Sequence, residues 1–173
     1  MEYKMQAMNQ FKTQQLNCYG HDKTRQIESQ WVASGGHLGS LMQRAGARCW
    51  DYCHQTWPDV QTLTVLCGPG ANGGDGYALA VAARQAGKVV YIIEVVPLNT
   101  AQTDARAMAQ LARQHNAQWI TDGDDPRLKS VDVVIDAMLG IGCQRSLDLP
   151  YSHWVTWCNA LAVPVLSIDL PSG

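Results

Sequence analysis

The chain has 173 residues, which is enough for one domain with a sizeable hydrophobic core. Its residues are 46% hydrophobic and 16% charged, with a formal net charge of -2. This balance lacks the basic excess of most nucleic-acid-binding proteins, and the longest apolar runs are too short to span a membrane. The first 15 residues are polar and carry no apolar segment typical of a secretory signal, so a cytoplasmic location is expected.

The hydrophobic pattern predicts helices that alternate with short apolar strands. We expect helices over 21–34, 37–57, 76–87, 100–116 and 151–161, and strands over 63–67, 89–95, 118–121, 131–139 and 163–170. Residues 1–20 show no strong period and are expected to form a mobile arm before one domain, 21–173. Apolar strands alternating with helices predict a three-layer αβα Rossmann-like fold with a mainly parallel central sheet. Ligands of such sheets bind at the carboxyl ends of the strands.

Six cysteines include Cys49 and Cys53, four residues apart in a predicted helix and followed by His54. This spacing suits a metal site, but no second cluster of ligands accompanies it. Buried, reduced thiols are therefore the expected state.

A glycine-rich segment, residues 68–76, follows the first predicted strand and contains five glycines in nine residues. Without Cβ atoms the backbone approaches a ligand closely, and the start of the next helix favours a phosphate. The segment matches G-x-G-x-x-G, and Glu94 ends the next strand, as in a dinucleotide-binding motif. A purely structural turn is the alternative. Asn72 and Asp75 favour a ligand, because a carboxylate beside phosphates needs a cation or a sugar hydroxyl between them.

Two further predicted strands end in acids, Asp136 and Asp169. Asp136 precedes a Gly-Ile-Gly turn and Arg145, and Asp169 precedes Ser172. Taken singly, Asp136 also suits a cap or turn, Arg145 a solvated charge, and the D-x-P-S-G sequence a plain turn. Together three strand ends bring hard oxygen donors to one rim, which favours a hard cation over zinc or copper. The donors are Asn72, Asp75, Asp136, Asp169 and Ser172.

Several ordered motifs resemble the NAD(P)H-hydrate epimerase family, the YjeF N-terminal domain, from about residue 21 to 173. They are Leu41–Gly46, the GPGANGGDGY segment Gly68–Tyr77, the DAMLGIGCQR segment Asp136–Arg145, Pro150–Tyr151 and the final IDLPSG. The family interconverts the R and S forms of the hydrated cofactors NADHX and NADPHX. The resemblance also implies a partner, the ADP- or ATP-dependent dehydratase that uses the S form, and a homodimer, which is common among relatives.

The resemblance assigns site residues in this sequence. It implies a substrate site made by residues 71–75, residues 140–146 and Asp169, and a potassium ion held by Asn72, Asp136 and Ser172. Asp169 is the predicted acid–base group, because a change of configuration at the hydroxyl-bearing carbon requires proton transfer at that oxygen. The substrate-binding residues are Ala71, Asn72, Gly73, Gly74, Asp75, Gly140, Ile141, Gly142, Cys143, Gln144, Arg145, Ser146 and Asp169.

Two residues depart from the family pattern. Ala71 replaces the first Asn of the usual N-N-G-G-D, and Ile141 replaces the Thr of the usual G-T-G, each removing a hydrogen-bonding group worth about 1 kcal/mol where it is used. Family members also continue beyond the P-S-G motif. The chain is therefore expected to be a truncated domain that lacks its last strands, exposes a sheet edge and need not be active.

Two other functions remain open from the sequence. One is a non-catalytic nucleotide-sensing or protein-binding module on the same scaffold, since fold does not fix function. The other is an NAD-dependent oxidoreductase, suggested by G-x-G-x-x-G with Glu94, which would need a second domain to handle the hydride.

Overall fold

The computed structural model describes residues 19–98, 101, 103–141 and 147–173. The chain divides into two compact units, residues 1–38 and 39–173. Within the first unit, helix α2 (His21–Ala33) is largely polar and exposed, although it also exposes Ile27, Trp31 and Val32. The predicted arm falls almost wholly outside the described residues and stays a prediction. None of the described helices has the length and hydropathy needed to cross a membrane.

The second unit is built on five parallel strands in the order β3-β2-β1-β4-β5. This order and the alternation of strands with helices confirm the predicted Rossmann-like fold. In chain order the elements are α3 (Leu38–Thr56), β1 (Thr62–Cys67), α4 (Ala71–Gln85), β2 (Val89–Glu94), α5 (Thr103–Gln114), β3 (Gln118–Trp119), the 3₁₀ helix η1 (Pro126–Ser130), β4 (Val133–Ala137), α6 (Tyr151–Ala160) and β5 (Val165–Ser167).

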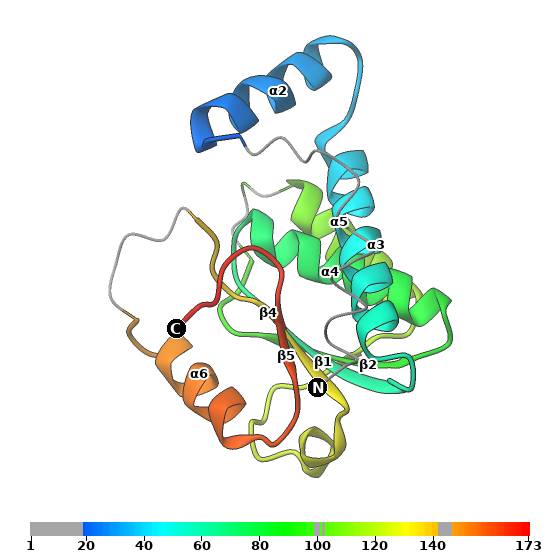
Figure 1. Ribbon diagram of the computed structural model, residues 1–173, viewed down its shortest axis with the longest axis vertical. Coiled ribbons are helices and arrows are strands. Elements are labelled where there is room, and N and C mark those ends of the chain that lie inside the picture. The colour runs from blue at the N-terminus through cyan, green and yellow to red at the C-terminus, as the bar shows by residue number, and fades with distance from the viewer. Residues whose placement is uncertain (1–18, 99–100, 102, 142–146) are drawn as a thin grey trace, which may run out of the picture. The chain divides into compact units, whose positions relative to one another are not determined.

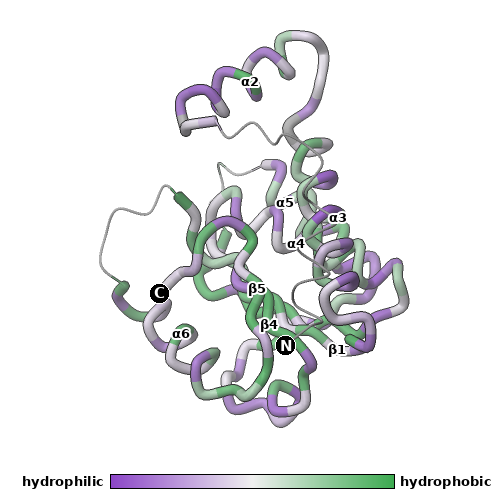
Figure 2. The backbone as a smooth tube through the Cα atoms, in the orientation of Figure 1, coloured by the Kyte–Doolittle hydropathy of each residue, from purple (hydrophilic) through white to green (hydrophobic). Residues whose placement is uncertain are grey.

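Helices cover both faces of the sheet, with α3, α4 and α5 on one side and α6 on the other (Figure 1). Successive side chains of a strand point to opposite faces of the sheet, so each strand contributes to the hydrophobic cores on both faces. In β1, Leu63 and Val65 pack toward α4, whereas Leu66 packs toward Tyr151 and Trp154 of α6. Figure 2 shows the resulting concentration of hydrophobic residues along the strands at the centre of this unit.

Helix α4 begins at Ala71, five residues before its predicted start, so the glycine-rich segment is a short turn followed by a helical first turn. Glycine usually weakens a helix, which is why the sequence predicted a longer loop. Close packing requires glycine inside this helix, because a Cβ on Gly73 would lie 2.0 Å from the carbonyl oxygen of Gly68. The helix therefore starts directly above the end of β1, with Gly70 as its N-cap residue and no side-chain cap.

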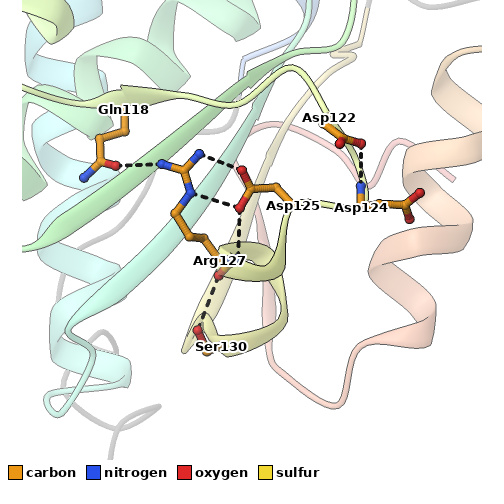
Figure 3. A network of polar contacts seen from close by, with 6 residues as sticks. All are labelled: Gln118, Asp122, Asp124, Asp125, Arg127 and Ser130. Atoms are coloured by element: carbon orange, nitrogen blue, oxygen red, sulfur yellow. Dashed lines mark hydrogen bonds and ion pairs between the residues drawn. The ribbon is translucent and has the colours of Figure 1, made fainter.

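A polar network holds the short edge strand β3 against the helix η1 (Figure 3). The sequence predicted a strand at β3 but no helix at η1. The Arg127 guanidinium donates to the Asp125 carboxylate at 2.6 and 2.9 Å and to the Gln118 side-chain oxygen at 3.0 Å. Asp125 also caps η1 by accepting from the Arg127 backbone N–H at 2.9 Å. These bonds hold the pKa of Asp125 at about 2, so the carboxylate is charged at neutral pH and anchors β3 to η1.

Thr64 lies in the centre of the sheet and is fully buried, and its hydroxyl has no hydrogen-bond partner among the described residues. An unsatisfied buried hydroxyl costs about 1–3 kcal/mol. We expect Thr64→Val to raise the free energy of unfolding by about 1 kcal/mol, seen as a higher urea midpoint with an unchanged slope. A lower midpoint would show instead that the hydroxyl has a partner, such as a buried water.

Candidate functional site

The crevice between the carboxyl ends of β1 and β4 is the point where the strand order reverses. From β1 the chain proceeds outward through β2 and β3, and then crosses to β4 on the other side of β1. Ligands of doubly wound sheets bind at such a switch point. Here the Gly68 N–H donates to the Ala137 carbonyl at 3.0 Å, which holds the two strand ends together.

Asp136 is the buried acid at this crevice, with only 5% of its surface exposed. One carboxylate oxygen accepts from the Met138 N–H at 3.1 Å and from the Ser172 hydroxyl at 2.7 Å. The other accepts from the Ser172 N–H at 2.8 Å and from the Ser167 hydroxyl at 3.3 Å. Asp136 thus ties the last residues of the chain to the end of β4.

Asn72 and Ser172 meet at the main chain of Leu139. The Asn72 side-chain amide donates to the Leu139 carbonyl at 2.8 Å, and the Leu139 N–H donates to the Ser172 hydroxyl at 3.2 Å. The structure therefore brings Asn72, Asp136 and Ser172 together, as the sequence predicted from three separate turns. The side-chain oxygen of Asn72, Oδ1, is buried and has no hydrogen-bond partner among the described residues.

This oxygen cluster has the chemistry of a site for a monovalent hard cation. Its single carboxylate, on Asp136, is buried, and no Lys, Arg or His of the described chain forms an ion pair with it. A buried charge and an unpaired buried oxygen are both costly, and a cation satisfies both. One carboxylate with neutral oxygens suits a monovalent cation better than a divalent ion, which prefers several carboxylates. The described residues also contain no cluster of three or more His, Cys, Asp or Glu placed to hold a metal.

Asp169 borders the same crevice, and its side chain is exposed. Its Oδ2 accepts from the Ile141 N–H at 2.7 Å, which ties it to the turn after β4. Gly140 lies between Asp169 and Asn72: a Cβ placed there would be 2.6 Å from Asp169 Oδ2 and 3.6 Å from the Asn72 Cβ. The turn therefore orients one carboxylate oxygen of Asp169 and leaves the other available to a ligand.

The other predicted site residues are placed as follows. Ala71 is exposed at the start of α4, and Gly73 and Gly74 are buried in its first turns. Asp75 lies on the same helix, and burial, with the charge of nearby Asp75 as a smaller cause, raises the pKa of the Cys49 thiol on α3. Gly142, Cys143, Gln144, Arg145 and Ser146 lie outside the described residues.

Two contributors to the crevice were missed by sequence reasoning. Ser167 donates to Asp136, and the Leu139 main chain joins Asn72 to Ser172. Ser167 could have been found, because it precedes Asp169 by two residues and so shares its side of the strand. In the structure, Ser167 lies opposite Asp136 in the register of β4 and β5. Leu139 acts through its backbone carbonyl and N–H, which every residue except proline has, so the sequence does not indicate its role.

The described thiols are unsuited to metal binding or nucleophilic chemistry. Cys49, Cys53, Cys67 and Cys158 are free, and the last three are buried, as predicted. Burial raises the pKa of Cys53 to about 11. Burial, with the nearby Asp136 charge, raises the pKa of Cys158 to about 12. These groups remain protonated at neutral pH and act as small hydrophobic side chains.

A methyl group at position 140 is expected to displace Asp169. In Gly140→Ala the new Cβ collides with Asp169 Oδ2 and pushes the carboxylate away from the crevice. Displacing a reacting group by about 1 Å typically costs roughly a hundredfold in rate, so a reaction that uses Asp169 should slow by about that factor. The matched control is Gly20→Ala, because Gly20 lies outside the glycine-rich segment and a Cβ at position 20 has no neighbour within 4 Å. Equal kcat values for the two variants would contradict this placement of Asp169.

The strand order, the glycine-rich turn and the oxygen cluster at the switch point define a doubly wound α/β domain of the Rossmann-like class. The family model for the YjeF-related protein N-terminus matches residues 38–173. The chain belongs to this family.

Named relatives agree with this assignment. An NAD(P)H-hydrate epimerase of Rhodobacter capsulatus is 35% identical over 166 residues, which cover 88% of this chain and 74% of that protein. A bifunctional NAD(P)H-hydrate repair enzyme of Coxiella burnetii is 33% identical over 155 residues, which cover 90% of this chain. The match spans only 32% of the Coxiella burnetii enzyme's own length.

A solved structure shows the same fold. The crystal structure of a yeast protein, ynu0 (YNL200c), superposes with a TM-score of 0.77 at 18% sequence identity. The superposition covers 91% of this chain and 72% of the yeast chain. At this identity the likeness concerns the fold alone.

Proposed function

We propose that this domain is an NAD(P)H-hydrate epimerase, which interconverts the R and S forms of NADHX and NADPHX. The observation that carries the proposal is the position of Asp169 beside the Asn72–Asp136–Ser172 oxygen cluster at the switch point. The activity named for the relatives supports the same reaction. The site thus joins a nucleotide-binding crevice to an acid–base group, which is what the epimerisation of a bound dinucleotide requires.

Asp169 acts as the acid–base group in this proposal. The reacting carbon carries a hydroxyl and the ring nitrogen, and the nitrogen lone pair helps to expel the hydroxyl. As the C–O bond breaks, the Asp169 acid gives its proton and water leaves. Water then adds to the opposite face of the ring and loses a proton to the solvent, from which the carboxylate regains its own proton, so atoms and charge balance. The Ile141 N–H holds Asp169 Oδ2 throughout, which leaves Oδ1 to exchange the proton.

We propose that a potassium ion occupies the oxygen cluster, held by Asn72 Oδ1, Asp136 and Ser172. When bound, potassium supplies positive charge that offsets the substrate phosphates and the Asp136 carboxylate. The residues themselves join the three loops that frame the crevice, since Ser172 bonds to Asp136 and Asn72 bonds to Leu139. Residues 71–75 and 140–146 are proposed to contact the dinucleotide.

Location and partners are also proposals. Free buried thiols are typical of a reducing compartment such as the cytoplasm, which is where we propose that the domain works. Relatives that are bifunctional repair enzymes support a dehydratase partner, fused or separate, to consume the S epimer. A homodimer stays a prediction, and sedimentation velocity at several concentrations tests it.

The activity is tested by chiral chromatography of R-NADHX incubated with the whole chain in potassium buffer. We expect the S epimer to form many times faster than in buffer alone, and the mixture to approach the same equilibrium. If the S epimer forms at the buffer rate while the chain binds the dinucleotide, the domain is a nucleotide-binding module rather than an enzyme.

A further inference from the structure

A second hollow lies one strand away from the crevice, between the end of β2 and helix α5. It has a volume of about 640 Å³, and its lining includes Glu94, Leu98, Thr103, Arg106, Gln110 and Arg113. It adjoins the glycine-rich turn, because Glu94 is in register with Cys67 and the Val95 N–H donates to the Cys67 carbonyl at 3.0 Å. In doubly wound dinucleotide-binding domains the adenosine ribose lies at this end of the second strand.

Glu94 is already engaged by protein donors. Its Oε1 accepts from the Tyr77 hydroxyl at 3.1 Å and from the Trp119 indole N–H at 3.0 Å, and Arg113 pairs with the same oxygen at 3.5 Å. Burial is the main reason that the pKa of Tyr77 is raised, so the phenol stays a donor. An acid at this position usually binds the ribose 2′-hydroxyl. Here Glu94 instead holds the groove wall together, and its negative charge is balanced by Arg113.

The groove carries a net positive charge. Arg113 lies over the Trp119 ring, with the guanidinium carbon 4.1 Å from the ring centroid, which is a cation–π contact. Arg106, on the same helix, lines the groove and has no ion-pair partner among the described residues. The groove contains two arginines and one carboxylate, Glu94, so it favours the binding of an anion. Guanidinium groups match the geometry of phosphate.

We propose that this groove is a subsite for a phosphate monoester on the adenosine ribose, with Arg106 and Arg113 as its ligands. The identity of the natural ligand rests on the proposed function: the 2′-phosphate that distinguishes NADPHX from NADHX. The reactive end of the dinucleotide then lies at Asp169 and the adenosine end at α5, on opposite sides of the glycine-rich turn. The phosphorylated substrate is consequently bound more tightly than the unphosphorylated one.

The test follows the Trp119 indole N–H signal by NMR during titrations of the whole chain. The chain has six tryptophans, and Trp119→Phe identifies the signal. The ligands are adenosine 2′,5′-bisphosphate, adenosine 5′-monophosphate and inorganic phosphate. We expect the bisphosphate to shift the signal with a Kd about tenfold below that of the monophosphate, and inorganic phosphate to bind more weakly than either. Arg106→Gln should remove the tenfold preference, and Arg48→Gln, an exposed arginine on α3, should retain it.

Equal Kd values for the two nucleotides, or an unchanged preference in Arg106→Gln, would overturn the proposal. Inorganic phosphate binding as tightly as the bisphosphate would overturn it as well, because the groove would then recognise an ion and not the nucleotide. These titrations need no turnover. A chain that shows the 2′-phosphate preference without forming S-NADHX would disprove the epimerase function alone, and an active chain without the preference would disprove the subsite alone.

Discussion

Asp169→Asn is expected to lower kcat for the epimerisation of NADHX by about a hundred- to ten-thousandfold, the range for loss of a positioned acid–base group. The amide has nearly the shape of the carboxylate, and its oxygen still accepts from the Ile141 N–H, so the turn after β4 keeps its place. An amide does not exchange the proton that the reaction requires. The affinity for the dinucleotide should therefore change little while turnover is lost.

The measurement is the initial rate of S-epimer formation, with dinucleotide binding followed in parallel by calorimetry. Asp59→Asn serves as the control, because Asp59 is also an exposed aspartate and precedes β1, at the end of the strand away from the crevice. The control should keep the original rate. An Asp169→Asn variant with a rate within about threefold of the original would rule out Asp169 as the acid–base group.

Asp136→Asn is expected to abolish the stabilisation of the domain by potassium. In the original chain, potassium bound to the folded state should raise Tm relative to tetramethylammonium of equal ionic strength. The amide removes the one charge of the oxygen cluster. Its NH₂ group also faces a donor, the N–H of either Met138 or Ser172. An unsatisfied buried donor costs about 1–3 kcal/mol, so the variant should also unfold at lower temperature in either salt.

A matched control separates the two effects. Asp132 accepts from the N–H groups of Gln61 and Thr62, both at 2.8 Å, at the opposite end of the sheet. Both bonds end on Oδ2, so Asp132→Ala removes the acceptor of both N–H groups and should lose stability, and yet keep the full response to potassium. A potassium response that survives in Asp136→Asn, or is absent from the original chain, would contradict the cation site.

The fold could be predicted from the sequence because apolar strand runs and amphipathic helices have distinct periods. The start of α4 could not, because glycine is read as a helix breaker, and only the contact between Gly73 and the Gly68 carbonyl shows why glycine is needed inside the helix. Strand β5 is also shorter than predicted, covering Val165–Ser167, because the chain leaves the sheet there to bring Asp169 and Ser172 to the crevice.

The convergence of Asn72, Asp136 and Ser172 followed from one topological rule, that parallel strands end at one edge. The contacts that could not be predicted from the sequence depend on the direction of side chains and on main-chain groups. Glu94 has the sequence position of a ribose ligand, yet it turns toward Tyr77 and Trp119. The sequence shows that an acid lies at the end of a particular strand. It does not show which hydrogen-bond donors of other elements contact that acid.

Anomalous diffraction from crystals soaked in rubidium, a heavier substitute for potassium, tests most directly whether the buried oxygens of the crevice hold a monovalent cation beside Asp169. We expect one strong peak in coordinating contact with Asn72 Oδ1, Asp136 and Ser172, the cluster that contains the unpaired amide oxygen. A crevice without rubidium, with a water molecule donating to Asn72 Oδ1, would contradict the proposed cation site.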